Sequence, residues 1–143
     1  MTKKSTKEVI SREVAIEEIR SFLGKYIRRT EFTDEKIEED YPDVLEAVQM
    51  GLITFDDKKV PTFTLETPIK NEDGDVAVEK VTFRTRVKPT TKAALGEGID
   101  LRKQAIKYSL NVIAYIIDQP KPMLDKFEPF DYDVIQQTSS VFS

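Results

Sequence analysis

The chain has 143 residues, of which 39% are hydrophobic and 34% charged, with a formal net charge of −4. This length is typical of a single domain with its own core, and the mixed, net acidic charge argues against nucleic acid as the main partner. Cysteine and histidine are both absent, which excludes thiolate zinc sites, thiol nucleophiles and Ser-His-Asp catalysis.

Residues 1–60 predict an N-terminal helical segment. Residues 7–27 repeat apolar side chains at three- and four-residue steps, which indicates an amphipathic helix. Thr33 can cap a following helical turn, and Pro42 is suited to the first turn of another helix. Gly51 then supplies the left-handed C-terminal cap that would end that helix.

Extended structure is predicted next. Residues 52–55 begin it, and residues 62–69 alternate apolar and polar side chains as a half-buried strand does. The Asp73-Gly74 pair predicts a β-hairpin turn over residues 71–75, with a returning strand over residues 76–87. The apolar phase of that strand slips, which predicts a β-bulge near Glu79 and Lys80.

The C-terminal half is predicted to be rich in helices. A short helix ends near Leu95, and a central helix over residues 99–117 carries a stripe of Ile106, Leu110, Ile113 and Ile117. Prolines break the chain after it, and a last helix covers about residues 131–142. We therefore predict an α+β fold, a β-hairpin or small antiparallel sheet with about five helices, in which residues 61–143 form the core of one compact domain.

The acidic residues carry no convincing catalytic or metal-binding pattern. Asn71, Asp73 and Asp75 have the spacing that opens a calcium loop, but Val76 and Thr82 stand where such a loop needs glycine and glutamate. A solvated turn explains them better. Other acids, such as Asp131 with Asp133, fit capping and helix-dipole roles. We expect a non-enzymatic protein with neither metal nor cofactor.

Two glycines and two pairs of side chains invite a functional reading. Gly96 and Gly98 lack the rest of a phosphate-loop motif, so a helix break explains them. Two pairs of side chains could contact a partner: Arg84 with Arg86, and Tyr108 with Tyr115. Such residues more commonly form a solvated strand face and part of the core, respectively.

The proline-broken C-terminal stretch is the candidate partner-binding surface. Aromatic and aliphatic side chains of the kind that dominate binding hot spots gather there, and chain termini are often accessible. Packing into the core is the equally weighted alternative. The candidate residues are Met123, Leu124, Phe127, Phe130, Tyr132, Val141 and Phe142.

The order of features from about Pro61 onward resembles the tail assembly chaperones of contractile-tailed bacteriophages, the Mu-like group among them. The quoted pattern consists of Leu65-Glu66-Thr67-Pro68-Ile69, a Gly74 turn, Glu79-Lys80-Val81-Thr82-Phe83-Arg84, Pro89, Asn111-Val112-Ile113-Ala114-Tyr115-Ile116-Ile117, and then Leu124, Phe127, Asp131 and Phe142. Residues 1–60 depart from the compact pattern of that family.

The resemblance implies a protein of the infected host's cytoplasm that is absent from the mature virion. It implies binding to the tape measure protein and recruitment of tail tube subunits. Self-association is a further contact that the sequence leaves open. A long helical client would dock in an apolar groove, for which the final two helices are the expected walls. The alternative is a structural component of the tail or head-tail connector. No apolar run is long enough to span a membrane and residues 1–8 lack a secretory signal, so no membrane partner is expected.

Overall fold

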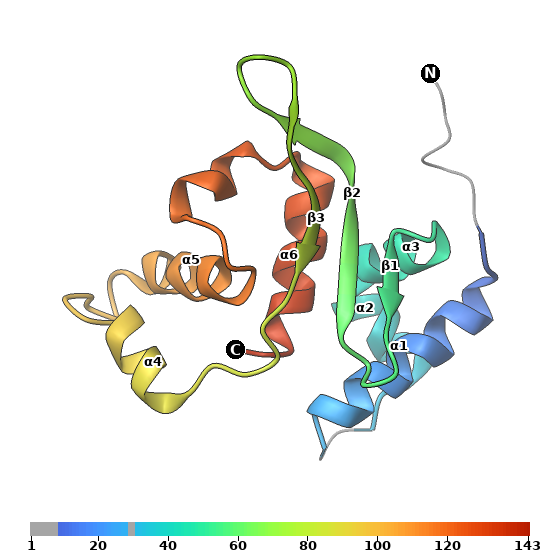
Figure 1. The fold of residues 1–143 in the computed structure, drawn as a ribbon. Helices are drawn as coiled ribbons and strands as arrows, with labels where there is room; N and C mark the ends of the chain where they lie inside the picture. The colour runs from blue at the N-terminus through green and yellow to red at the C-terminus, as the bar shows by residue number, and fades with distance from the viewer. Residues whose placement is uncertain (1–8, 29–30) are drawn as a thin grey trace.

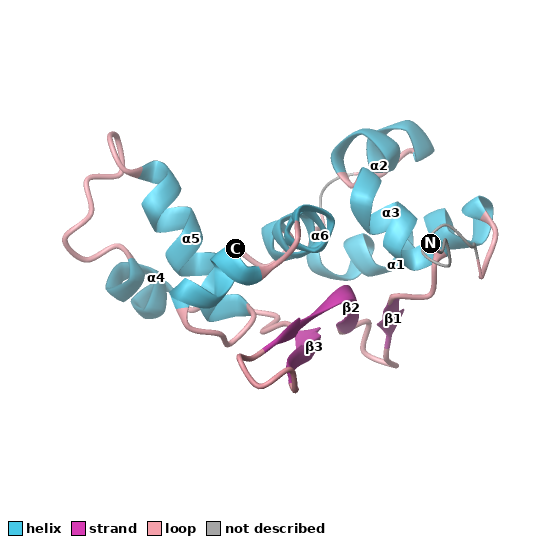
Figure 2. Cartoon of the chain, turned by 90° about the horizontal axis from the view of Figure 1, so that it is seen from above, coloured by secondary structure: helices cyan, strands magenta, loops and turns pink. Residues whose placement is uncertain are grey.

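The computed structural model describes residues 9–28 and 31–143, and it confirms the α+β class. A three-stranded antiparallel sheet, in the order β1-β2-β3, has the helices gathered on one of its sides (Figures 1 and 2). The elements are α1 (Arg12–Tyr26), α2 (Asp34–Asp40), α3 (Pro42–Gln49), β1 (Ile53–Phe55), β2 (Pro61–Lys70), β3 (Val76–Thr82), α4 (Pro89–Leu95), α5 (Ala105–Ile116), the 3-10 helix η2 (Lys121–Lys126) and α6 (Pro129–Ser140).

Local capping chemistry sets the ends of the N-terminal helices. The predicted first helix begins at Arg12, because the Ser11 hydroxyl accepts the N–H of Val14; Lys7, where the prediction started, lies outside the described residues. Three predictions are confirmed. The Thr33 hydroxyl caps α2, Pro42 occupies the first turn of α3, and Gly51 follows that helix with φ +78°.

The β-hairpin forms as predicted, with Gly74 at φ +88° and the Asn71 side-chain oxygen accepting the N–H groups of Asp73 and Asp75. The returning strand ends at Thr82 rather than Val87. Beyond that point the backbone leaves the sheet, because the Arg84 N–H donates to the carbonyl of Ile116 at the end of α5.

The predicted bulge is present opposite Glu79, but its extra residues belong to β2 and not to β3. Thr64 pairs with Lys80, and the next pair is Ile69 with Val78. The four β2 residues 65–68 therefore stand opposite Glu79 alone, and Pro68 cannot donate to a ladder in any case. A smaller irregularity at Ala77 leaves Val78 buried and Val76 51% exposed.

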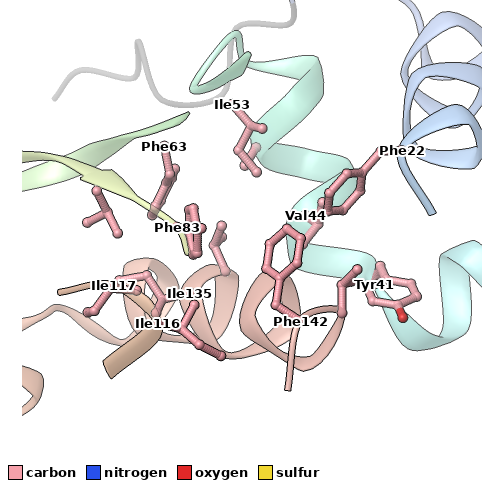
Figure 3. Close-up of a cluster of buried hydrophobic side chains, with 14 of the residues drawn as sticks. Phe22, Tyr41, Val44, Ile53, Phe63, Phe83, Ile116, Ile117, Ile135 and Phe142 are labelled. Atoms are coloured by element: carbon pink, nitrogen blue, oxygen red, sulfur yellow. The ribbon is translucent and has the colours of Figure 1, made fainter. Parts of the chain in front are cut away.

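The core lies between the sheet and helices α1, α3, α5 and α6. Its fully buried members come from both halves of the chain, so residues 1–60 and 61–143 share one core. Figure 3 shows part of this cluster. The largest buried side chains include Phe22, Ile19, Leu23, Phe63, Ile116, Ile117, Val134 and Ile135.

The central helix is shorter than predicted, and its first half projects beyond the core. The helix begins at Ala105 rather than Ile99, because residues 101–103 form a turn in which the Asp100 carboxylate accepts the N–H of Arg102. Ile113 and Ile117 are buried, but Ile106, expected on the same stripe, is 77% exposed. The predicted stripe is therefore wrong at its N-terminal end.

Candidate functional site

The seven candidate residues of the C-terminal stretch are packed against or within the core. Leu124, Phe127, Val141 and Phe142 are buried, while Met123, Phe130 and Tyr132 are partly buried against the same cluster. The Phe142 ring lies 4.9 Å from that of Tyr26, centroid to centroid. It also lies 5.8 Å from the ring of Phe22, and Figure 3 shows these two rings. This arrangement is the core-packing alternative, and it leaves little of the four buried side chains for a partner to reach.

A groove next to these residues is a candidate binding site. It is a cavity of about 310 Å³ between α5 and α6, with α4 at its rim. Val112 and Ile113 supply its buried apolar wall on α5, and half-buried Tyr108 extends that wall. The complete lining is Lys92, Tyr108, Ser109, Val112, Ile113, Gln136, Ser139, Ser140 and Ser143.

Two buried hydroxyls on α6 distinguish this region. Thr138 and Ser139 are each 1% exposed, and neither side-chain oxygen has a hydrogen-bond partner among the described residues. A buried polar group without a partner costs about 1–3 kcal/mol. Ser139 lies beside the groove, but its hydroxyl oxygen is covered, so it belongs to the buried base of the groove.

Two contacts hold α4 in place as a rim of the groove. The Asn111 side-chain amide on α5 donates to the carbonyl of Leu95 at 2.9 Å. Gly96, at the end of α4, also lies beside the Tyr108 ring, where an added Cβ atom would be 3.4 Å from the ring, an ordinary contact distance.

Arg84 and Tyr115, which the sequence offered as separate partner grips, are brought together on the other side of α5. The Arg84 guanidinium lies 4.5 Å from the centre of the Tyr115 ring, its Nε donates to the Tyr115 carbonyl, and it pairs with Asp118 at 2.9 Å. These contacts join the end of β3 to the end of α5. Arg86 is exposed and Tyr108 lines the groove.

Two acidic residues that lie outside the groove lining accept hydrogen bonds from the backbone. The buried Asp131 carboxylate accepts the N–H groups of Glu66 and Thr67, and Asp56 accepts those of Lys58 and Val60. Burial raises the pKa of Asp131, but this side chain faces the β2 backbone and does not line the groove. Within the described residues, no group of three or more acidic side chains is placed to hold a metal ion.

Residues 84–111 form a basic arm that was not predicted from the sequence. This basic arm includes α4 and the first half of α5. None of its residues from Lys88 to Asn111 is buried. It contains seven arginine and lysine residues against two acidic ones in a chain whose net charge is −4. A segment-by-segment charge count was the signal that could have found it.

Comparison of the chain with protein-family models, curated proteins and solved structures finds no match. In the part of the chain that the structure describes, no helix is both long enough and apolar enough to cross a bilayer.

Proposed function

We propose that the protein is a non-enzymatic tail assembly chaperone that holds a helical segment of a phage tape measure protein in the groove between α5 and α6. In this proposal it acts in the host cytoplasm, helps to recruit tail tube subunits, and is left out of the mature virion. The observation that carries the proposal is the groove itself, which has the last helix, α6, as one wall and α5 as the other.

The chemistry of the groove supports a helical protein client. Amphipathic helices bind by laying an apolar face into an apolar groove, while polar groups at the rim fix their register. Here Val112 and Ile113 form the apolar wall, and Ser109, Gln136 and Ser140 are exposed polar residues along it.

The order of elements gives further support. The segments that resemble the chaperone family fall on β2, the hairpin turn, β3, α4, α5, η2 and α6 in turn. Together they make one hairpin followed by the helices that wall the groove. The proposed contact residues are now those of the groove, in place of the C-terminal aromatic stretch predicted from the sequence. The proposed client is the same.

A structural component of the tail or head-tail connector remains the second candidate, because the same α+β domain and groove would also suit a permanent contact in the particle. The protein content of purified virions distinguishes the two functions. A chaperone is absent from them, whereas a structural component is present in stoichiometric amounts, as mass spectrometry of the particles would show.

The direct test is co-expression with the tape measure protein of the same genome, followed by pull-down. Gln136→Trp fills the groove from an exposed position, and Asp133→Trp places the same side chain on α6 outside the groove lining. We expect the wild type and Asp133→Trp to retain the client and Gln136→Trp to lose it. Failure of the wild type to bind any tape measure segment would reject the proposed function, and equal binding by both variants would reject the groove.

A further inference from the structure

Large exposed apolar side chains fall mainly at two places on this protein. In the described residues they are Val9, Val14, Val76, Leu101 and Ile106. Val76 belongs to the hairpin. Val9 and Val14 flank the start of α1, and Leu101 and Ile106 lie in the basic arm, at 57% and 77% exposure. Contiguous exposed apolar groups rimmed by polar residues mark protein contact sites, whereas single ones are common on any surface.

The two places carry opposite charge. Near the start of α1, four exposed residues, Glu13, Val14, Glu17 and Glu18, form what we call the α1 face. Exposed Arg12 lies beside them and pairs with Glu38 on α2. On the arm, residues 101–107 contain Arg102, Lys103 and Lys107 and no acidic residue. We call these seven residues the arm patch.

Few of these charges are neutralised within the molecule. Glu17 pairs with Arg20. Glu13, Glu18 and the three cations of the arm patch form no ion pair with any residue that the structure describes. The α1 face and the arm patch are therefore complementary both in charge and in their exposed aliphatic side chains.

One molecule cannot bring the two surfaces together. Helices α4 and α5 lie at one end of the protein and α1 at the other, in both views (Figures 1 and 2). The sheet and α6 stand between them. A contact between these surfaces must join two copies, and because it uses different patches on each copy it is a head-to-tail contact.

We propose that the arm patch of one copy docks on the α1 face of a second copy, with Leu101 and Ile106 against Val14 and the three cations against Glu13, Glu17 and Glu18. This inference goes beyond the proposed function and does not depend on it. The patches are small, and interfaces below about 1,200 Å² are typically weak and transient. The contact is therefore a reversible one that strengthens at low salt, where unlike charges attract over a longer range.

Sedimentation velocity over a concentration series tests the contact with the full chain alone. We expect concentration-dependent association that weakens about tenfold or more between roughly 50 mM and 500 mM salt, since ions screen exposed pairs. Lys103→Glu/Lys107→Glu should abolish association, and so should Glu13→Lys/Glu18→Lys. Lys121→Glu/Lys126→Glu is the matched control, because it reverses two exposed charges outside the arm and should associate as the wild type does.

Mixing the two reversed variants gives the decisive result. Each variant should fail to associate with itself. In the mixture, the unchanged arm patch of one variant can dock on the unchanged α1 face of the other, and the two reversed surfaces also carry opposite charge, so mixed association should return. Circular dichroism confirms that each variant is folded. A wild type that stays monomeric at every concentration and salt, association that survives both reversals, or a mixture that fails to associate would each overturn the proposal.

Discussion

The carboxylate of Asp131 on α6 accepts the backbone N–H of Glu66 on β2 at 3.0 Å, and its second oxygen accepts that of Thr67 at the same distance. Glu66 and Thr67 lie in the bulged part of β2 that has lost its regular pairing with β3. Asp131 thus replaces the missing strand partner and holds the sheet against α6. This contact positions the helix that forms one wall of the groove.

The Asp131 contact predicts a specific loss of stability. Asp131→Asn keeps one acceptor oxygen but turns an amide N–H₂ toward the second backbone donor, leaving that buried N–H without a partner. We expect the free energy of unfolding to fall by about 1–3 kcal/mol. Asp133→Asn, at an exposed position on the same helix, should change it by less than about 0.5 kcal/mol. Urea denaturation measures both, and equal values would contradict the role given to Asp131.

The same residue predicts a dependence of stability on pH. Burial raises the pKa of Asp131 more than its two N–H donors lower it. A carboxyl whose folded-state pKa is raised contributes stability that is full below its ordinary pKa of about 4 and is lost as the pH rises through the raised value. The stability gap between wild type and Asp131→Asn should therefore widen as the pH falls from 7 toward 4. A gap that narrows would mean that the N–H donors outweigh burial.

A second long-range contact caps α3. Helix α3 begins at Pro42 with no side-chain cap of its own, and the Gln137 oxygen on α6 accepts the N–H groups of Asp43 and Val44. Its amide also donates to the Asp43 carboxylate at 2.7 Å. Gln137→Ala should lower the midpoint of thermal unfolding, with a loss of about 1–2 kcal/mol. Gln136→Ala, exposed on the same helix, serves as the control and should leave that midpoint nearly unchanged.

Phe142 is predicted to act through the core. Its ring packs on Phe22 and Tyr26 and lies 6.4 Å from Phe83, centroid to centroid. Truncation of a buried phenylalanine costs about 3–5 kcal/mol, so Phe142→Ala should unfold at a much lower denaturant concentration. A Phe142→Ala variant that keeps wild-type stability but loses the client would instead show that the C-terminal aromatic stretch itself contacts the partner.

Local chemistry made much of the fold predictable. The Thr33 cap, Pro42, Gly51 and the Asp73-Gly74 turn each depend on neighbours a few residues away, and each forms as predicted. The pairing of β2 with β3 was predicted only in part. The phase slip in residues 76–87 revealed an irregular ladder, but which strand holds the extra residues depends on the opposite strand.

The candidate site was harder to predict, because the periodicity of apolar residues does not show which apolar faces other elements cover. Helical spacing predicts that Phe142 and Ile106 each lie on an apolar face. It does not predict that Phe142 is buried and Ile106 is exposed. Asp131 with Glu66 and Gln137 with Asp43 are separated by 65 and 94 residues. Contacts across such distances follow from the packing of α6, which no local pattern specifies.

The most direct test of the groove as a client site is hydrogen exchange of the purified protein with and without helical segments of the tape measure protein. If the client binds in the groove, amide exchange should slow in α5 and α6 around Val112 and Ser139 when the client is added, with no change in α1 or α2. Protection confined to other elements, or none at saturating client, would contradict it.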